Sequence, residues 1–518
     1  MYIGDFARTR PDHPAVVHTG TGQALSYREL DQRSNRLARL LRAEGLRCGD
    51  TVALFMENNI RYLEIVWAAL RSGLYLTAIN RYLTAEEAAY IIDDCDARAL
   101  VSSRAMEGVA AALRGRLPRC RRFLMTDGAI PGWEAYEQAV AEFEAAPLQQ
   151  ESSGELMLYS SGTTGRPKGV RRALRDVPPS DDSLDTTLIE DYGFGEDTIY
   201  LSPAPMYHAA PLVFSLGVQR CGGTVLMMPR FDAADALALI ERHRATHAQF
   251  VPTMFVRMLK LDPAERARFD LSSLRCAIHA AAPCPVAVKR AMIEWWGPII
   301  HEYYGGTEGN GRTAITSSEW LERPGSVGRA RLGTLRICDE TGAEVPPGTP
   351  GLVYFEREAL PFAYHKDEAR TRAAQHSAHP TWTTLGDVGY VDQDGYLFLT
   401  DRKAFMIISG GVNIYPQEIE DVFIAHPKVR DVAVFGLPDP EMGERVVAVV
   451  EPMEGAAPGA DLADELLDHA ARHLARYKLP KTIDFTAALP RLPTGKLYKK
   501  ALREEYLARG VAPTPPIR

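Results

Sequence analysis

The stretch Tyr159-Ser160-Ser161-Gly162-Thr163-Thr164-Gly165-Arg166-Pro167-Lys168-Gly169-Val170 follows the apolar run 156–158. It combines glycines that let backbone N–H groups approach an anion, hydroxyls that donate to phosphate oxygens, and the positive charge of Lys168. Its spacing differs from the GxxxxGK[ST] pattern, so it does not indicate a P-loop NTPase. Glycine, serine and threonine also build plain polar loops. The stretch by itself predicts either a phosphate-binding loop or a solvated hairpin.

Composition excludes several classes of protein. The 518 residues correspond to roughly three domains at about 150 residues each, and 46% hydrophobic with 24% charged residues is ordinary for a globular chain. A net charge of −8 argues against a nucleic-acid-binding protein. The seven cysteines are widely spaced without a CxxC, which favours reduced thiols. With no signal peptide and no run of about 18 apolar residues, we expect a cytoplasmic protein without a transmembrane segment.

Alternating helix and strand patterns predict the fold class. Residues 26–47 read as an amphipathic helix with Ser26 as N-cap, and 51–56 and 74–79 read as buried strands. Similar units recur over 221–303, and short connections of this kind favour parallel sheets. Short alternating strands follow over 331–400. We therefore predict an α/β protein: a large N-terminal lobe of two parallel-sheet α/β subdomains plus a β-rich subdomain, with a small mobile α+β C-terminal domain.

After Gly410-Gly411 the helix and strand patterns continue to a Lys/Arg-rich end, and a compact α+β lobe of about 115 residues fits the usual domain range. Residues 171–192, rich in Asp, Ser and Pro, are predicted to form a solvated loop.

Five motifs together resemble one family. The glycine-rich stretch resembles the phosphate loop of the adenylate-forming superfamily, which includes acyl-CoA synthetases. Tyr304-Gly305-Gly306-Thr307-Glu308 resembles its Tyr-Gly-x-Thr-Glu motif, and Leu385-Gly386-Asp387 its Thr-Gly-Asp motif, with Leu in place of Thr. Asp401-Arg402 with 407–411 resembles its domain junction, and Pro493-Thr494-Gly495-Lys496 its C-terminal lysine motif. The junction implies an N-terminal AMP-binding domain over 1–401 and a mobile C-terminal domain over 402–518 that carries the catalytic lysine. The five motifs occur in the family's order across nearly the whole chain. Within the family, the chain as a whole most resembles fatty-acid–CoA ligases.

The resemblance implies roles for these residues. The catalytic set is Lys496, Thr307, Glu308 and His208, with Thr307 donating to the α-phosphate, Glu308 holding Mg²⁺, and Lys496 bridging carboxylate and α-phosphate. Tyr304 would pack on adenine, and Asp387 and Arg402 would hold the ribose. The implied binding set for ATP and coenzyme A is Ser160, Ser161, Gly162, Thr163, Thr164, Gly165, Lys168, Tyr304, Gly305, Asp387, Arg402, Gly410 and Gly411.

The implied reaction has two steps and explains a second lobe. An acid and ATP, both anions, must be neutralised and aligned to give acyl-AMP. The small lobe then rotates, Lys496 leaves, and the paired glycines 410 and 411 admit the pantetheine arm of coenzyme A. The family's pivot residue is commonly Asp or Lys, whereas this chain has Ala404 there. The identity of the pivot therefore stays open.

The residues of the candidate substrate pocket are small or apolar, and the small ones leave room for a sizeable acyl tail. Its predicted walls are His208, Ala209, Thr253, Met254, Ala280, Ala281, Ala282, Gly305 and Gly306. Because no Asp or Arg stands among them, an apolar acid is favoured over an amino acid. A fatty acid comes first, with aryl and sterol side-chain acids as alternatives.

Two other activities stay open at this point. One is an acyl-AMP ligase that loads a carrier protein; the other is a non-catalytic nucleotide-binding protein. The expected partners are the acid, ATP and CoA, not nucleic acid, and the oligomeric state is undecided, a homodimer included.

Overall fold

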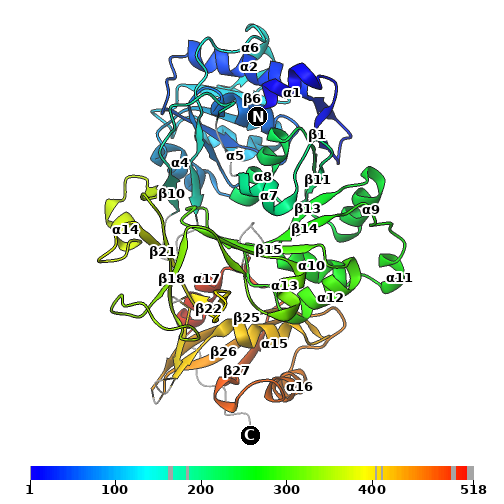
Figure 1. Ribbon diagram of the computed structural model, residues 1–518, viewed down its shortest axis with the longest axis vertical. Coiled ribbons are helices and arrows are strands. Elements are labelled where there is room, and N and C mark those ends of the chain that lie inside the picture. The colour runs from blue at the N-terminus through cyan, green and yellow to red at the C-terminus, as the bar shows by residue number, and fades with distance from the viewer. Residues whose placement is uncertain are drawn as a thin grey trace.

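The computed structural model describes residues 2–160, 167–181, 186–402, 405–409, 412–440, 442–491 and 497–509. Its sheets form two α/β parts, an antiparallel part beside them, and a C-terminal part at the bottom of Figure 1. Among the described helices, none combines the length and hydropathy that crossing a membrane requires.

The first α/β part is built on a six-stranded sheet of order β7-β6-β5-β3-β4-β8, in which all neighbours are parallel. Every residue of β3 is buried, because helices cover both faces. Ser26 accepts from the backbone of Glu29 and starts α2 with a capping box, so the predicted N-cap is confirmed. The elements are α2 (Tyr27–Ala43), β3 (Thr51–Phe55), α3 (Tyr62–Leu70), β4 (Tyr75–Ala78), α4 (Ala85–Asp94), β5 (Ala97–Ser103), α5 (Glu107–Leu113), β6 (Arg122–Thr126), β7 (Glu134–Ala135), α6 (Tyr136–Ala141) and β8 (Glu155–Leu156).

The second α/β part is built on a nine-stranded sheet of order β17-β16-β15-β14-β13-β11-β12-β1-β2. Its strands from β1 to β15 are parallel, and β2, β16 and β17 pair antiparallel at the edges. Its elements are α1 (Ile3–Thr9), β1 (Pro14–His18), β2 (Ala24–Ser26), α7 (Thr186–Tyr192), β11 (Ile199–Ser202), α8 (Ala209–Arg220), β12 (Thr224–Met227), α9 (Ala233–His243), β13 (His247–Phe250), α10 (Pro252–Leu259), α11 (Pro263–Arg266), β14 (Cys276–His279), α12 (Val286–Trp296), β15 (Ile300–Gly305), β16 (Arg312–Ile315), α13 (Ser317–Glu322) and β17 (Arg329–Leu332).

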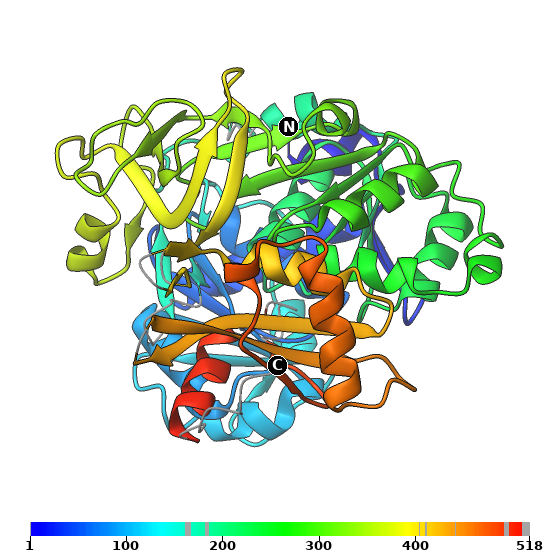
Figure 2. The ribbon, with the colours of Figure 1, turned by 90° about the horizontal axis from the view of Figure 1, so that it is seen from below.

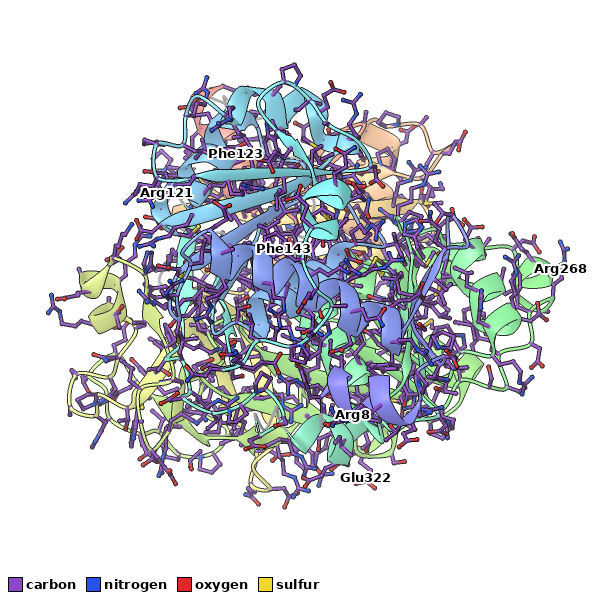
Figure 3. The ribbon with its side chains drawn as sticks, turned by 90° about the horizontal axis from the view of Figure 1, so that it is seen from above. Arg8, Arg121, Phe123, Phe143, Arg268 and Glu322 are labelled. Atoms are coloured by element: carbon purple, nitrogen blue, oxygen red, sulfur yellow. The ribbon has the colours of Figure 1, made fainter. Side chains whose placement is uncertain are left out.

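The two faces of this sheet pack into different cores. Tyr200, Cys276 and Ile278 join the core that contains α8 and the first α/β part, whereas Leu201, Ala248 and Ala277 join a core with α9, α10 and α12. Figure 3 shows Arg268, just beyond α11, and Glu322, at the end of α13, at the periphery. Residues alternate between the faces along each strand, so the cores can be assigned residue by residue.

The predicted β-rich subdomain is an antiparallel sheet of order β18-β19-β21-β22, and a separate three-stranded sheet has the order β20-β10-β9. In the latter, β10 leaves the glycine-rich stretch and pairs with β20, Val170 opposite Tyr364. The elements are β9 (Leu158–Ser160), β10 (Lys168–Arg171), β18 (Thr334–Cys338), β19 (Gly351–Glu356), β20 (Ala363–Tyr364), α14 (Glu368–Ala373), β21 (Trp382–Val391) and β22 (Leu397–Arg402).

The C-terminal part has the sheet order β24-β23-β26-β25, with β27 parallel to β26. Seen from below, it lies in front of both α/β parts (Figure 2). Lys260 Nζ, at the end of α10, donates to the backbone oxygen of Val429 at 3.0 Å and joins the two regions. The elements are β23 (Ile407–Ser409), β24 (Val412–Ile414), α15 (Pro416–Ile424), β25 (Val429–Asp439), β26 (Gly443–Pro452), α16 (Ala460–Ala471), β27 (Thr482–Phe485) and α17 (Lys499–Ala508).

One predicted loop was wrong. Residues 171–192 include α7, and its Leu188 and Tyr192 are buried in the core beside α8. These residues are four apart and so share one helix face, a signal masked by the polar residues before them. The predicted boundary at 401/402 falls on the end of β22, whose Arg402 pairs with Asp387, while the next described strand belongs to another sheet.

Candidate active site

The carboxyl ends of β13, β14 and β15 bring several predicted site residues to one edge. Thr253 follows β13, Ala280 follows β14, and Gly305 ends β15. His208 is the N-cap of α8 after β11. Ligands in α/β sheets bind beyond the carboxyl ends of the strands, so this edge is the expected position of a substrate.

Tyr304 and Asp387 contact each other as the shared nucleotide role implies. Tyr304 Oη donates to Asp387 Oδ2 at 2.7 Å, although 83 residues separate them. The Tyr304 ring stacks on Phe355 with 6.2 Å between centroids. Asp387 is buried and stands opposite Arg402 in the β21–β22 register. Strands β15, β21 and β22 thus bring the three predicted nucleotide-binding residues Tyr304, Asp387 and Arg402 close together.

A buried cluster joins the glycine-rich stretch to the second motif. Tyr364 Oη donates to Glu308 Oε1 at 2.9 Å, and both residues are less than a tenth exposed, at 7% and 8%. Lys168 Nζ lies 4.7 Å from the centroid of the Tyr364 ring. Lys168 is in register with Ser160 at the base of the glycine-rich segment. Carboxylate oxygens are the ligands that Mg²⁺ prefers, so Glu308 fits a magnesium site.

Two side chains pack closely against the second motif. Arg172 Nη2 donates to the backbone oxygen of Thr307 at 2.9 Å. A Cβ at Gly309, where φ is +62°, would lie 2.7 Å from Arg172 Nη2. A Cβ at Gly306 would lie 2.3 Å from Leu385 Cδ1. The Leu that replaces the family's Thr therefore packs directly on the motif it accompanies.

The structure divides the predicted acid pocket. His208 and Ala209 lie at the start of α8, and Ala280 and Gly305 stand at the edge that α8 faces. Met254 instead packs into the core on the opposite face of the sheet. Ala281 and Ala282 are exposed, and Gly306 precedes Thr307 in the loop beyond β15.

His208 is a half-buried side chain with a neutral imidazole. Desolvation lowers the pKa of this imidazole to about 3, and its Nε2 has no hydrogen-bond partner among the residues that the structure describes. The Tyr207 ring lies 4.2 Å away. A histidine in this state carries no positive charge near pH 7, so any part that it plays in the site is that of a neutral side chain.

A buried arginine stands beside the predicted pocket walls. Arg312 is opposite Gly305 in the β15–β16 register. Its Nη2 donates to Asp191 Oδ2 at 2.8 Å. No local pattern indicates this contact, because Asp191 and Arg312 are 121 residues apart.

Other predicted residues lie outside the described ranges. These are Ser161, Gly162, Thr163, Thr164, Gly165, Gly410, Gly411 and Lys496, together with the pivot position Ala404. The roles assigned to them, and to the side chain of Arg402, stay predictions.

Comparisons with known proteins identify the family. The family model of AMP-binding enzymes matches residues 4–364, and that of the AMP-binding enzyme C-terminal domain matches 418–496. The chain belongs to the AMP-binding enzyme family. The resemblance to adenylate-forming enzymes is thereby confirmed, and the chain is an AMP-forming ligase of the acid–thiol type.

Its relatives differ in the acids that their names carry. The chain is 31% identical to the long-chain-fatty-acid–CoA ligase FadD13 of Mycobacterium tuberculosis, with 97% of each chain covered. It is 34% identical to a feruloyl-CoA synthase of an Amycolatopsis species, over 96% of this chain and 97% of the relative. An anthranilate CoA ligase solved with anthranoyl-AMP has a TM-score of 0.85 and 26% identity, covering 98% of this chain and 97% of that one. The family is therefore settled and the acid is not.

Proposed function

We propose that this chain activates a carboxylic acid with ATP and transfers the acyl group to coenzyme A. A carboxylate oxygen attacks the α-phosphorus of ATP, and the bond to pyrophosphate breaks. The CoA sulfur then attacks the acyl carbon, the bond to AMP breaks, and the thiol proton passes to solvent. The observation that carries this proposal is the cluster of half-buried Lys168 with the buried residues Tyr364 and Glu308, together with the Tyr304–Asp387 pair.

The first step needs positive charge between two anions. Lys168 sits at the end of the glycine-rich segment and supplies one such charge. Glu308, oriented by Tyr364, would hold Mg²⁺, which when bound neutralises phosphate charge. Arg172 donates to the backbone oxygen of Thr307, and we assign the Thr307 hydroxyl to an α-phosphate oxygen.

The nucleoside would occupy the corner formed by β15 and β21. Tyr304 offers a ring face, and Asp387 has a buried carboxylate with acceptor capacity for ribose hydroxyls. The second step is assigned to the C-terminal domain, with Lys496 leaving and Gly410-Gly411 lining the thiol path. The acid itself is apolar over most of its length, a fatty or aryl acid.

The half-reactions test the proposal. Lys496→Ala should abolish acid-dependent ATP–pyrophosphate exchange yet keep most of the thioester formation from preformed acyl-AMP and CoA. Lys481→Ala, an exposed lysine in the same domain, is the matched control. If both half-reactions survive in Lys496→Ala, the assigned role is wrong.

A carrier-protein ligase is distinguished in the same assay. Such an enzyme would perform the exchange but consume little free CoA with any acid. ATP binding without turnover of any acid would instead favour a non-catalytic nucleotide-binding protein.

A further inference from the structure

An aromatic floor consists of Tyr192 on α7, Tyr200 on β11, Phe214 on α8 and Tyr303 on β15, which pack in one core. Figure 1 shows the ribbons of helices α7 and α8 next to one another. Phe214 on α8 stacks against Tyr303 at 5.7 Å and 22°, and against Tyr200 at 6.5 Å and 21°. The Tyr192 ring lies 5.6 Å from Phe214. Phe214 therefore has ring contacts with the three other residues of the aromatic floor.

Gln249 on β13 forms hydrogen bonds with two tyrosines of the aromatic floor. Its Nε2 donates to Tyr303 Oη at 3.1 Å, and its Oε1 accepts from Tyr200 Oη at 3.4 Å. Tyr200 is 0% exposed, and Phe214 and Tyr192 are each 4% exposed. Rings that are both stacked and hydrogen-bonded keep one arrangement, so the aromatic floor is rigid.

The floor lies close to the predicted reaction site. Tyr303 and Gly305 share one face of β15 because side chains alternate along a strand. Two residues of strand correspond to roughly 7 Å. An acid whose carboxylate lies at the Gly305 edge and whose tail runs along this face therefore meets Tyr303 after about one ring's length. A long acyl chain has no path through contacts of this kind.

Two buried donors at the floor have no partner among the described residues. They are Tyr192 Oη and Arg312 Nε. Arg312 and Arg331 both pair with the single carboxylate of Asp191, so this group of three carries a net positive charge. Arg312 pairs with Asp191, which precedes Tyr192 in the chain, and stands opposite Gly305, two residues beyond Tyr303, so its guanidinium lies beside the floor. A buried donor without a partner is costly, and an acceptor on a bound ligand would remove that cost.

We propose that the acid is a compact aromatic acid with a hydrogen-bond-accepting oxygen on its ring. Its ring packs against Tyr303 and Phe214, and the oxygen accepts from Tyr192 Oη and Arg312 Nε. This inference rests on the proposed function, because it names the substrate class of the same site.

A matched pair of substrates tests the inference. 4-Methoxybenzoate and 4-ethylbenzoate have nearly the same shape and differ in one acceptor oxygen, and their 3-substituted isomers cover the other ring position. CoA consumption with ATP and Mg²⁺ should give a kcat/KM roughly fivefold or more higher for the methoxy acid in at least one pair. Octanoate and palmitate should be turned over at least tenfold more slowly than the better methoxybenzoate.

Two variants separate recognition from folding. Tyr192→Phe should lower kcat/KM for the methoxy acid while leaving the ethyl acid within twofold, a difference that a folding defect would not produce. Phe214→Ala should raise the relative activity with octanoate by opening the floor. A palmitate kcat/KM above that of every aryl acid would overturn the inference, as would an equal effect of Tyr192→Phe on both acids. If none of the acids supports CoA consumption, that result contradicts the proposed function instead.

Discussion

Removing one hydroxyl tests the buried cluster at the centre of the site. In Tyr364→Phe the ring keeps its position over Lys168 and its edge contact with Phe362, whose centroid lies 5.2 Å away. The 2.9 Å hydrogen bond to Glu308 Oε1 is lost. Glu308 then loses the donor that orients one of its oxygens.

The expected loss follows from the chemistry of that bond. A hydrogen bond to a charged group contributes about 1.5–3 kcal/mol, and 1.36 kcal/mol corresponds to a factor of ten in rate. We therefore expect kcat/KM for ATP to fall by roughly ten- to a hundredfold in acid-dependent ATP–pyrophosphate exchange. Because Glu308 is assigned to Mg²⁺, the concentration of Mg²⁺ giving half-maximal exchange should rise as well.

The control is Tyr390→Phe, a ring on β21 that stacks on Phe398 at 5.1 Å. It should leave exchange within twofold and the Mg²⁺ requirement unchanged. A Tyr364→Phe protein with the wild-type thermal midpoint and exchange within twofold at every Mg²⁺ concentration would refute the reasoning.

Three further predictions concern stability. Lys289→Met breaks the buried 2.6 Å ion pair with Glu302 and should lower the free energy of unfolding in urea by about 3–5 kcal/mol. The double variant Lys289→Met/Glu302→Leu should regain much of this free energy. An unchanged urea midpoint in Lys289→Met would contradict the prediction. Burial raises the pKa of Asp421 to about 6, so its contribution to stability is full below its unfolded pKa and is lost as pH rises through 6. Asp421→Asn should therefore raise the thermal midpoint at pH 8 and not at pH 4, and a shift of equal size at both would exclude this cause. Ala281 has φ +74°, so Ala281→Gly should raise the midpoint slightly, whereas Ala282→Gly next to it should lower it.

Much of the fold could be predicted from local patterns. Ser26 and Glu29 form a capping box within one turn, and the burial of Thr51–Phe55 follows from its apolar run. Such patterns span only a few residues, so they can be recognised in the sequence alone. The helix over 186–192 was missed, because its apolar face is short and polar residues precede it.

The candidate site divides in the same way. The five motifs identified the family, since each is a contiguous stretch whose chemistry depends on neighbours in sequence. Tyr364, Arg172 and Arg312 were missed, because each meets its partner only through sheet pairing or helix packing. A tyrosine on a two-residue strand carries no local sign that its hydroxyl reaches a carboxylate 56 positions away.

The sequence alone determined that this chain handles adenylates, because glycines, hydroxyls and charges at fixed local spacing suffice to state that chemistry. Only the tertiary structure decided which side chain donates to Glu308, that His208 is neutral, and that Arg312 stands opposite Gly305 next to a cluster of stacked rings. The reason is physical: burial and partner choice depend on strand register and on the packing of distant segments, and neither quantity exists until the chain has folded.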